Sequence, residues 1–322
     1  MKLADWQVER GIGEDRALLL NGDEVLAAKV YWPGELFAGQ IVNATLVSRT
    51  SGSSRGTAEI EQGTKVLLDR IPPSLSEGSA LEIAITRPPI AERGRLKLAQ
   101  GRVTDGILRG KKSPFDGLDA QTTRRFPSGA WEEVWQAAAS GQLEFAGGSL
   151  TFSVTPAMTL IDIDGDLPPR ELALASVPAI VQGLRWFDLG GSIGIDFPTV
   201  SAKEDRKAVD EALSAALFDW PHERTAMNGF GFVQIVARHD GPSLLHRFAS
   251  SRVGICARNA LRIGELSEGH GPVLLLTVHP ALHAKLKGNW INELARRTGK
   301  EVRIETDPSL ALEAAQAQII GR

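Results

Sequence analysis

Residues 158–197 read Met158-Thr-Leu-Ile-Asp162-Ile-Asp164-Gly-Asp166, then a segment of helical composition, then Asp188-Leu-Gly-Gly-Ser-Ile-Gly-Ile-Asp196-Phe197. Each end of this stretch is a short run of β-branched and apolar residues, which is typical of a strand. Two strands that are joined by a crossover helix must be parallel if they share a sheet. The stretch therefore predicts a βαβ unit, and the rest of the chain is expected to be built around it.

Alternation along the two predicted strands brings carboxylates onto one face of the sheet. Asp162 and Asp164 share a face of the first strand, and Asp196 shares a face of the second strand with Gly194. Neighbouring strands lie about 4.8 Å apart, so the carboxylates of Asp162 and Asp196 are expected to lie close together. Two like charges at close range need a cation, and oxygen-only ligands suit Mg²⁺ or Mn²⁺. The pattern predicts a metal site with Asp162 and Asp196 as ligands, and room beside Gly194 for a ligand to approach.

There are two alternative interpretations of these aspartates. Asp often ends a strand and starts a turn without any further role. A calcium loop is suggested by the alternate spacing of Asp162, Asp164 and Asp166. It fails because the glycine is displaced to Gly165 and Ala173 stands where a bidentate Glu must close the loop. The strand-end interpretation stays open.

Three segments of this stretch together resemble the catalytic heart of the ribonuclease E/G family. They are Asp162-Ile-Asp164-Gly, Arg185-Trp-Phe-Asp-Leu-Gly-Gly191 and Ile195-Asp196-Phe197, where the family has Ile-Asp-Ile-Asn, Arg-Asp-Leu-Gly-Gly and Ile-Asp-Phe. The resemblance implies a metal-dependent endoribonuclease in which Asp162 and Asp196 bind Mg²⁺ beside the scissile phosphate of single-stranded RNA. Asp164 stands at the position of the family's Asn, and its implied role is to orient a water molecule or to add a metal ligand.

The chain of 322 residues is long enough for two or three domains. We expect an α+β or α/β fold in which a five-stranded OB-type barrel is inserted near the N-terminus of a mixed-sheet nuclease domain, RNase H-like or DNase I-like. The expected parts are residues 1–34 as a hairpin packing on the catalytic domain, 35–102 as an RNA-binding-like barrel, 103–142 as a reduced sensor or linker region, and 143–322 as the catalytic domain.

Local signals place the strands of the N-terminal third. Asn21-Gly22 between apolar runs is a strong hairpin signal. Five short segments separated by Gly and Pro predict the barrel strands at residues 40–47, 55–60, 64–68, 80–86 and 93–99. Barrels of this kind grip single strands by stacking bases on aromatic side chains, but residues 55–68 contain no aromatic residue. The barrel is therefore expected to bind RNA weakly or to serve as a structural wall.

Capping and periodicity signals place the later helices. Pro178 is expected to start the main crossover helix with Ser176 as its cap, because proline is tolerated in a first turn. A helix over residues 203–218 opens with Ser201 and Glu204 at capping-box spacing. The end of the chain is predicted as a strand at 273–278, a helix at 280–297, a strand at 301–305 and a helical tail.

Composition indicates an ordinary globular protein, with 43% hydrophobic residues, 23% charged residues and a net charge of −3. No run of 18 apolar residues occurs and the chain starts without the apolar core of a signal peptide. A cytoplasmic protein with no membrane partner is expected. Any positive field for RNA must be local, and the basic clusters that would supply it are residues 109–112, 124–125 and 296–297.

The single cysteine, Cys256, stands where the family carries a Cys-Pro-Arg-Cys motif that links subunits through zinc. The second cysteine of that motif is replaced by Asn259. The chain also has His239, His246 and His270, but their spacings match no finger or knuckle pattern. We expect no structural zinc, and any homo-oligomer would not be linked by zinc.

Three functions compete. The leading one is an Mg²⁺-dependent endoribonuclease acting in RNA processing or decay; recognition of a 5′ monophosphate is expected to be absent, because Gly229 and Gln234 replace the family's Arg and Glu. The second is a non-catalytic RNA-binding or ribosome-associated protein that keeps the fold. The third is a metal-dependent phosphohydrolase for a small substrate. It is disfavoured because the glycine-rich run 190–194 precedes a strand, whereas a dinucleotide fingerprint follows one.

Overall fold

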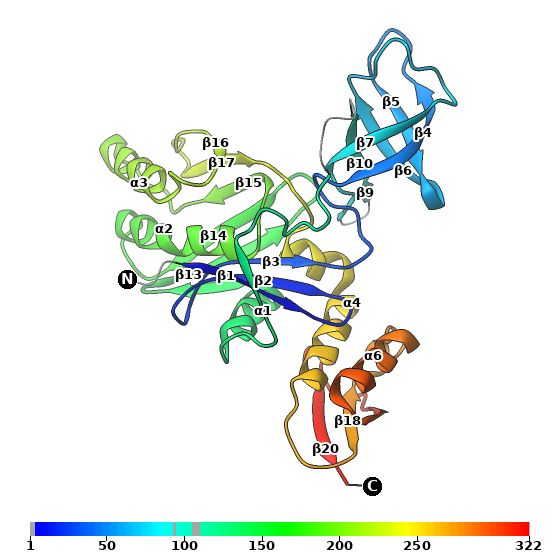
Figure 1. Cartoon of the computed structure of the whole chain (residues 1–322). Helices are drawn as coiled ribbons and strands as arrows, with labels where there is room; N and C mark the ends of the chain where they lie inside the picture. Colours follow the sequence, from blue (N-terminus) through cyan, green and yellow to red (C-terminus); the bar gives the residue numbers. More distant parts are fainter. Residues whose placement is uncertain (1–3, 93–94, 105–109, 322) are drawn as a thin grey trace.

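The computed structural model describes residues 4–92, 95–104 and 110–321. It shows a mixed α and β protein with a six-stranded sheet in its body, a closed five-stranded barrel at one end and a small sheet with the C-terminus at another (Figure 1). The expected mixed class and the closed five-stranded barrel are confirmed. Within the described ranges, no helix has the length and apolar character needed to cross a membrane.

The six-stranded sheet contains the βαβ unit. Its strands, in spatial order, are β12 (Gln142–Phe145), β13 (Gly148–Val154), β14 (Thr159–Gly165), β15 (Gly191–Asp196), β17 (Phe232–Ala237) and β16 (His222–Arg224). β14 and β15 pair in parallel, and the other neighbours pair antiparallel. Helix α2 (Pro169–Trp186) forms the crossover between them. The prediction of two parallel neighbouring strands is confirmed, and both strands end at the same edge of the sheet.

One face of this sheet is apolar and covered. Ile161 of β14 and Ile193 and Ile195 of β15 are fully buried, in one core cluster with residues of α2. Helices α1 (Ala130–Ser140) and α3 (Lys203–Ala216) contribute to the same core. Because side chains alternate along a strand, the residues between these isoleucines must face away from the core.

Helix α2 starts earlier than expected. It begins at Pro169, and Pro178 lies in its interior. Proline is favoured in the first turn of a helix, so Pro169 supplies the start that was assigned to Pro178. Ser176 is not a cap: it is buried within the helix and its hydroxyl donates to the carbonyl oxygen of Ala173. The expected start and cap of this helix are therefore wrong.

The N-terminal hairpin belongs to a four-stranded sheet. β2 (Asp15–Asn21) and β3 (Glu24–Tyr31) pair antiparallel around the predicted turn. β1 (Asp5–Arg10) pairs with β2, and β11 (Ala120–Thr123) pairs in parallel with β1. β3 packs on α2, so the hairpin covers the body of the protein.

The barrel closes with a different fifth strand from the one expected. Its strands are β4 (Ile41–Arg49), β5 (Gly56–Ile60), β6 (Thr64–Asp69), β7 (Ala80–Arg87) and β10 (Ala99–Val103), with a 3-10 turn (Glu61–Gly63) between β5 and β6. The first four agree with the predicted segments. β9 (Arg95–Lys97) instead pairs with β8 (Ile90–Glu92), and β10 closes the barrel by pairing with both β6 and β7. Residues 93 and 94 of the predicted strand lie outside the described residues.

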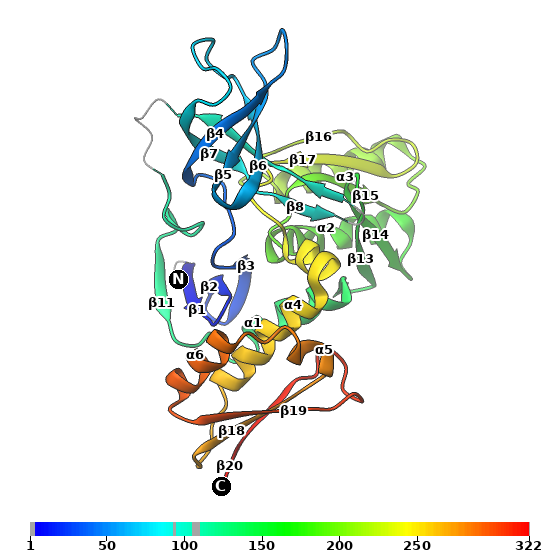
Figure 2. The same cartoon turned by 90° about the vertical axis from the view of Figure 1, so that its right-hand side faces the viewer.

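Helix α4 (Leu244–Glu265) runs from the body to the C-terminal sheet (Figure 2). A buried ion pair anchors it, because Arg262 of α4 lies 2.7 Å from Glu9 of β1. Arg16 of β2 lies 3.0 Å from the same carboxylate. The sheet beyond it places β18 (Val273–Val278) between β19 (Glu301–Thr306) and β20 (Gln316–Ile320).

Three expectations for the later helices and the tail are wrong. The helix at 280–297 is divided into α5 (Pro280–His283) and α6 (Gly288–Thr298). The tail is strand β20, which pairs antiparallel with β18, so sheet pairing outweighs the helical propensity of this segment. The capping box at Ser201 and Glu204 is absent, because α3 is preceded by Ala202 and has no side-chain cap.

Candidate metal centre

Asp162 and Asp196 are direct neighbours across the parallel pair of β14 and β15. They are register partners at the carboxyl ends of the two strands. Register partners point to the same face of a sheet, and the buried Ile161 and Ile195 beside them identify that face as the one away from the core. The structure therefore brings together the two residues that were expected to share a metal.

Asp164 lies on the same face of β14, two residues beyond Asp162 and about 6.6 Å further along the strand. Its register partner on β13 is Ser149, whereas Asp162 lies opposite Thr151. Asp164 is therefore at the outer margin of the pair, on the same face but not directly opposite Asp196.

The three carboxylates are exposed to solvent. Within the described ranges, none of them accepts a hydrogen bond or forms an ion pair. By contrast, Asp210 is paired with Arg224 at 2.8 Å. Like charges side by side without a counterion repel each other, so this arrangement favours the binding of a cation.

The donor set at this edge fits Mg²⁺ or Mn²⁺. It consists only of carboxylate oxygens, which these hard cations prefer. No group of three or more His, Cys, Asp or Glu side chains able to hold a metal occurs in residues 4–92, 95–104 and 110–321. Mg²⁺ needs only one or two carboxylates when water and a substrate phosphate supply its other ligands. Asp162 and Asp196 are the residues that would hold it.

Gly194 does not leave room for a ligand. A Cβ atom added at Gly194 would lie 2.5 Å from Cζ of Phe232 and 2.9 Å from Cδ2 of Leu160. The space above Gly194 is filled by side chains of the protein itself, so the expectation is wrong. The glycine instead permits the close approach of the Phe232 ring, and Phe232 is the register partner of Asp196 on β17.

The turn that precedes β17 is attached to the same edge. The side-chain oxygen of Asn228 accepts the backbone N–H groups of Phe230 at 2.9 Å and of Phe232 at 3.0 Å. Gly231, with φ of +89°, accepts the N–H of Phe197 at 3.1 Å. This turn leaves Phe230 84% exposed. Phe230 was not among the site residues predicted from the sequence. The Asn-Gly-Phe-Gly run at 228–231, which is typical of a tight turn, was the signal for its position.

The barrel is connected near the opposite end of β15. That strand begins at Gly191 against the ring of His239, and Pro88, just after β7, lies against Gly241. A six-residue strand spans about 16 Å. The barrel connection and Asp196 thus lie at opposite ends of β15, with the barrel on the right of Figure 1 and the sheet on the left.

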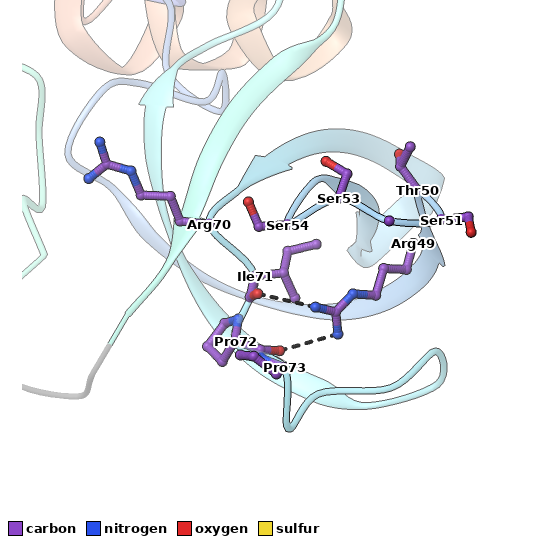
Figure 3. Close-up of a pocket in the computed structure, with 10 residues that line it drawn as sticks. Arg49, Thr50, Ser51, Ser53, Ser54, Arg70, Ile71, Pro72 and Pro73 are labelled. Atoms are coloured by element: carbon purple, nitrogen blue, oxygen red, sulfur yellow. Dashed lines mark hydrogen bonds between the residues drawn. The ribbon is translucent and has the colours of Figure 1, made fainter.

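A hollow of about 670 Å³ lies at the tip of the barrel. Figure 3 shows Arg49 directed at the carbonyl oxygens of Ile71 and Pro72, and Arg70 pointing away from the hollow. Arg49 also donates to the carbonyl oxygen of Leu75 at 2.8 Å. Its guanidinium therefore holds the loop after β6 in place.

Two of the predicted basic clusters contain arginines that are paired with carboxylates. Both arginines of 296–297 are bonded to Glu293. Arg125 pairs with Glu268 at 2.9 Å. Arg109, in the first cluster, lies outside the described residues. The positive field expected around these clusters is thus weakened by carboxylates at two of the three.

Cys256 is buried within α4. Burial, reinforced by the nearby Glu313, raises the pKa of its thiol to about 12, so the thiolate that zinc requires is disfavoured. The rings of His239 and His246 are 5.5 Å apart, and His270 lies in an exposed loop. The absence of structural zinc stays a prediction, which this thiol chemistry supports.

Two carboxylates with no partner among the described residues and an exposed aromatic ring therefore share one edge of the six-stranded sheet. The sequence matches no family model and no curated protein.

Proposed function

We propose that this protein is a metal-dependent endoribonuclease that hydrolyses single-stranded RNA. The observation that carries the proposal is the placement of Asp162 and Asp196 as register partners at one sheet edge, exposed and without a counterion among the described residues. Adjacent like charges repel each other, so the pair is more stable with a cation than without one. A site for Mg²⁺, or for Mn²⁺, explains why both are there.

Asp162 and Asp196 would hold the metal, and their oxygen donors fit it. The bound cation would supply Lewis-acid stabilisation of the phosphoryl charge and a more acidic water. Asp164, at the margin of the pair, orients the attacking water. The water oxygen bonds to phosphorus while the bond from phosphorus to the 3′ oxygen breaks, which leaves a 5′ phosphate on one product and a 3′ hydroxyl on the other.

The substrate class is supported by the resemblance of three segments around these aspartates to the ribonuclease E/G family. In this proposal, the closed barrel is of the OB type and the six-stranded sheet is the nuclease sheet. The barrel strands carry no aromatic residue, so we assign the barrel a supporting role and the sheet edge the contact with RNA.

The test is cleavage of an end-labelled single-stranded RNA with Mg²⁺, with and without a chelator. We expect endonucleolytic products with 5′ phosphates, lost on chelation, and similar rates on 5′-hydroxyl and 5′-monophosphate substrates. A duplex of the same sequence serves as the control and should be cut more slowly. If the protein binds the RNA but cuts neither substrate with Mg²⁺ or Mn²⁺, the non-catalytic RNA-binding function takes the place of the enzyme.

A further inference from the structure

We propose that Phe230 is a stacking platform for one base of the RNA strand at the Asp162–Asp196 edge. This inference rests on the proposed function and adds to it a base-binding subsite. The occupant is an unpaired nucleobase, because an aromatic ring held open to solvent offers a π face that any base can cover.

The position of Phe230 ties it to the carboxylates. Phe232, two residues later, is the register partner of Asp196, and the backbone N–H of Phe197 donates to the carbonyl oxygen of Gly231 at 3.1 Å. The turn therefore lies beside the end of β15, where Asp196 is located. A nucleotide whose phosphate lies at Asp196 has its neighbouring bases within reach of this turn.

The turn is rigid. Asn228 accepts two backbone N–H groups through its side chain, and its own N–H donates to the carbonyl oxygen of Phe232 at 3.1 Å. A side chain at Gly231 would lie 2.4 Å from the carbonyl oxygen of Phe197, so the turn fits closely against β15. A platform that is already ordered loses little conformational entropy when a base stacks on it.

Phe230 is exposed where the neighbouring aromatic residues are covered. Its ring is 84% exposed, whereas Phe197 and Phe232 in the same region are buried or half-buried. One ring at a carboxylate-lined edge is too small for a stable protein interface, which needs about 800 Å² from each partner. A single base is an occupant of matching size, and a cation held by Asp162 and Asp196 would reduce their repulsion of its phosphate.

The experiment measures binding of a non-hydrolysable single-stranded RNA analogue that carries 2-aminopurine at one position at a time, in Mg²⁺, so that the cation is present and the RNA stays intact. For the wild type we expect quenching at one position, because stacking quenches this base. Phe230→Ala should remove that quenching and weaken binding about tenfold, within the range for loss of one stacked base. Phe230→Trp should retain both. Phe218→Ala is the matched control, since Phe218 is 86% exposed but follows α3, away from this turn.

An oligonucleotide with an abasic site at the quenched position gives the specific test. Removing the base should weaken binding to the wild type and leave binding to Phe230→Ala unchanged, because both changes remove the same contact. Equal binding of the RNA by Phe230→Ala and the wild type overturns the inference. It is also overturned if Phe230→Ala binds the abasic oligonucleotide more weakly than the wild type does, since no base is there to stack. Cleavage with Mg²⁺ is recorded separately: cutting without an effect of Phe230 defeats only the stacking site, whereas stacking without cutting defeats only the nuclease.

Discussion

The closed barrel and the open edge of the six-stranded sheet differ in what their residues do. In the barrel, Leu46, Leu68 and Ile83 fill the interior and are at most 1% exposed, and its strands carry no aromatic residue. At the sheet edge, Asp162 and Asp196 face solvent side by side. Folding accounts for the first set and not for the second. On this contrast we base the proposal that the ligand binds at the sheet edge rather than on the barrel.

The largest expected effect separates the two regions by activity. Asp162→Asn and Asp196→Asn should each lower the rate of RNA cleavage by about a thousandfold or more, because each removes a metal ligand that stabilises transition-state charge by several kcal/mol. The barrel control is Asp69→Asn, which removes an exposed carboxylate paired with Arg55 and should leave cleavage unchanged. Single-turnover rates at saturating protein give the comparison. A comparable loss for Asp69→Asn would mean that the barrel takes part in the chemistry.

Stability should separate the same two regions. Arg262→Met leaves the buried Glu9 without one of its cations, so we expect the free energy of unfolding to fall by about 3–5 kcal/mol. Arg55→Met, in the exposed barrel pair with Asp69, should change it by less than about 1 kcal/mol. Urea unfolding followed by far-ultraviolet circular dichroism measures both. Similar values for the two variants would show that the buried ion pairs do not anchor α4.

A smaller effect concerns the end of β15 near the barrel. Burial, together with His246 and the cations Lys97 and Arg87, lowers the pKa of His239 to about 4. Below pH 6.5 the unfolded chain binds a proton at His239 and the folded chain does not. The stability linked to the neutral ring is therefore fully present above pH 6.5 and is lost as the pH falls toward 4. The loss amounts to at most ~3 kcal/mol.

The check is urea unfolding at several pH values for the wild type and His239→Gln, which has no titrating ring at that position. The wild type should lose more stability than the variant between pH 6.5 and pH 4. Parallel curves would show that His239 is protonated normally in the folded protein.

The smallest expected effect belongs to the barrel surface. Leu67 is 40% exposed on β6, and Leu67→Ala should change RNA affinity by less than about twofold and stability by less than about 0.5 kcal/mol. Filter binding of the same RNA to Leu67→Ala and Phe230→Ala makes the comparison direct. A larger loss of affinity for Leu67→Ala than for Phe230→Ala would place the main RNA contact on the barrel instead of the sheet edge.

Much of the fold was predictable because its signals are local. The parallel pair of β14 and β15, the hairpin at Asn21-Gly22 and four barrel strands follow from alternation and turn residues. The fifth barrel strand and the C-terminal strand β20 were not predictable, because distant partners decide them: β10 completes the closure with β6 and β7, and β20 lies on the edge of β18.

The candidate site shows the same division. The pairing of Asp162 with Asp196 follows from counting residues along two strands once these strands are adjacent, and the structure supplies that adjacency. The role of Gly194 was misjudged, because the ring that fills its space comes from Phe232, 38 positions further along the chain. The exposure of Phe230 depends on how the turn at Asn228 lies against β15, and no local pattern specifies that contact.

The most direct test of the central claim is a Mn²⁺ titration followed by electron paramagnetic resonance, on the wild type, Asp162→Asn and Asp196→Asn. The account predicts about one ion bound per wild-type chain in the presence of a non-hydrolysable RNA analogue, because two carboxylates and a phosphate together satisfy such a cation. It predicts binding at least tenfold weaker in each variant, with circular dichroism unchanged. Equal Mn²⁺ binding by the wild type and both variants would contradict a metal centre at Asp162 and Asp196.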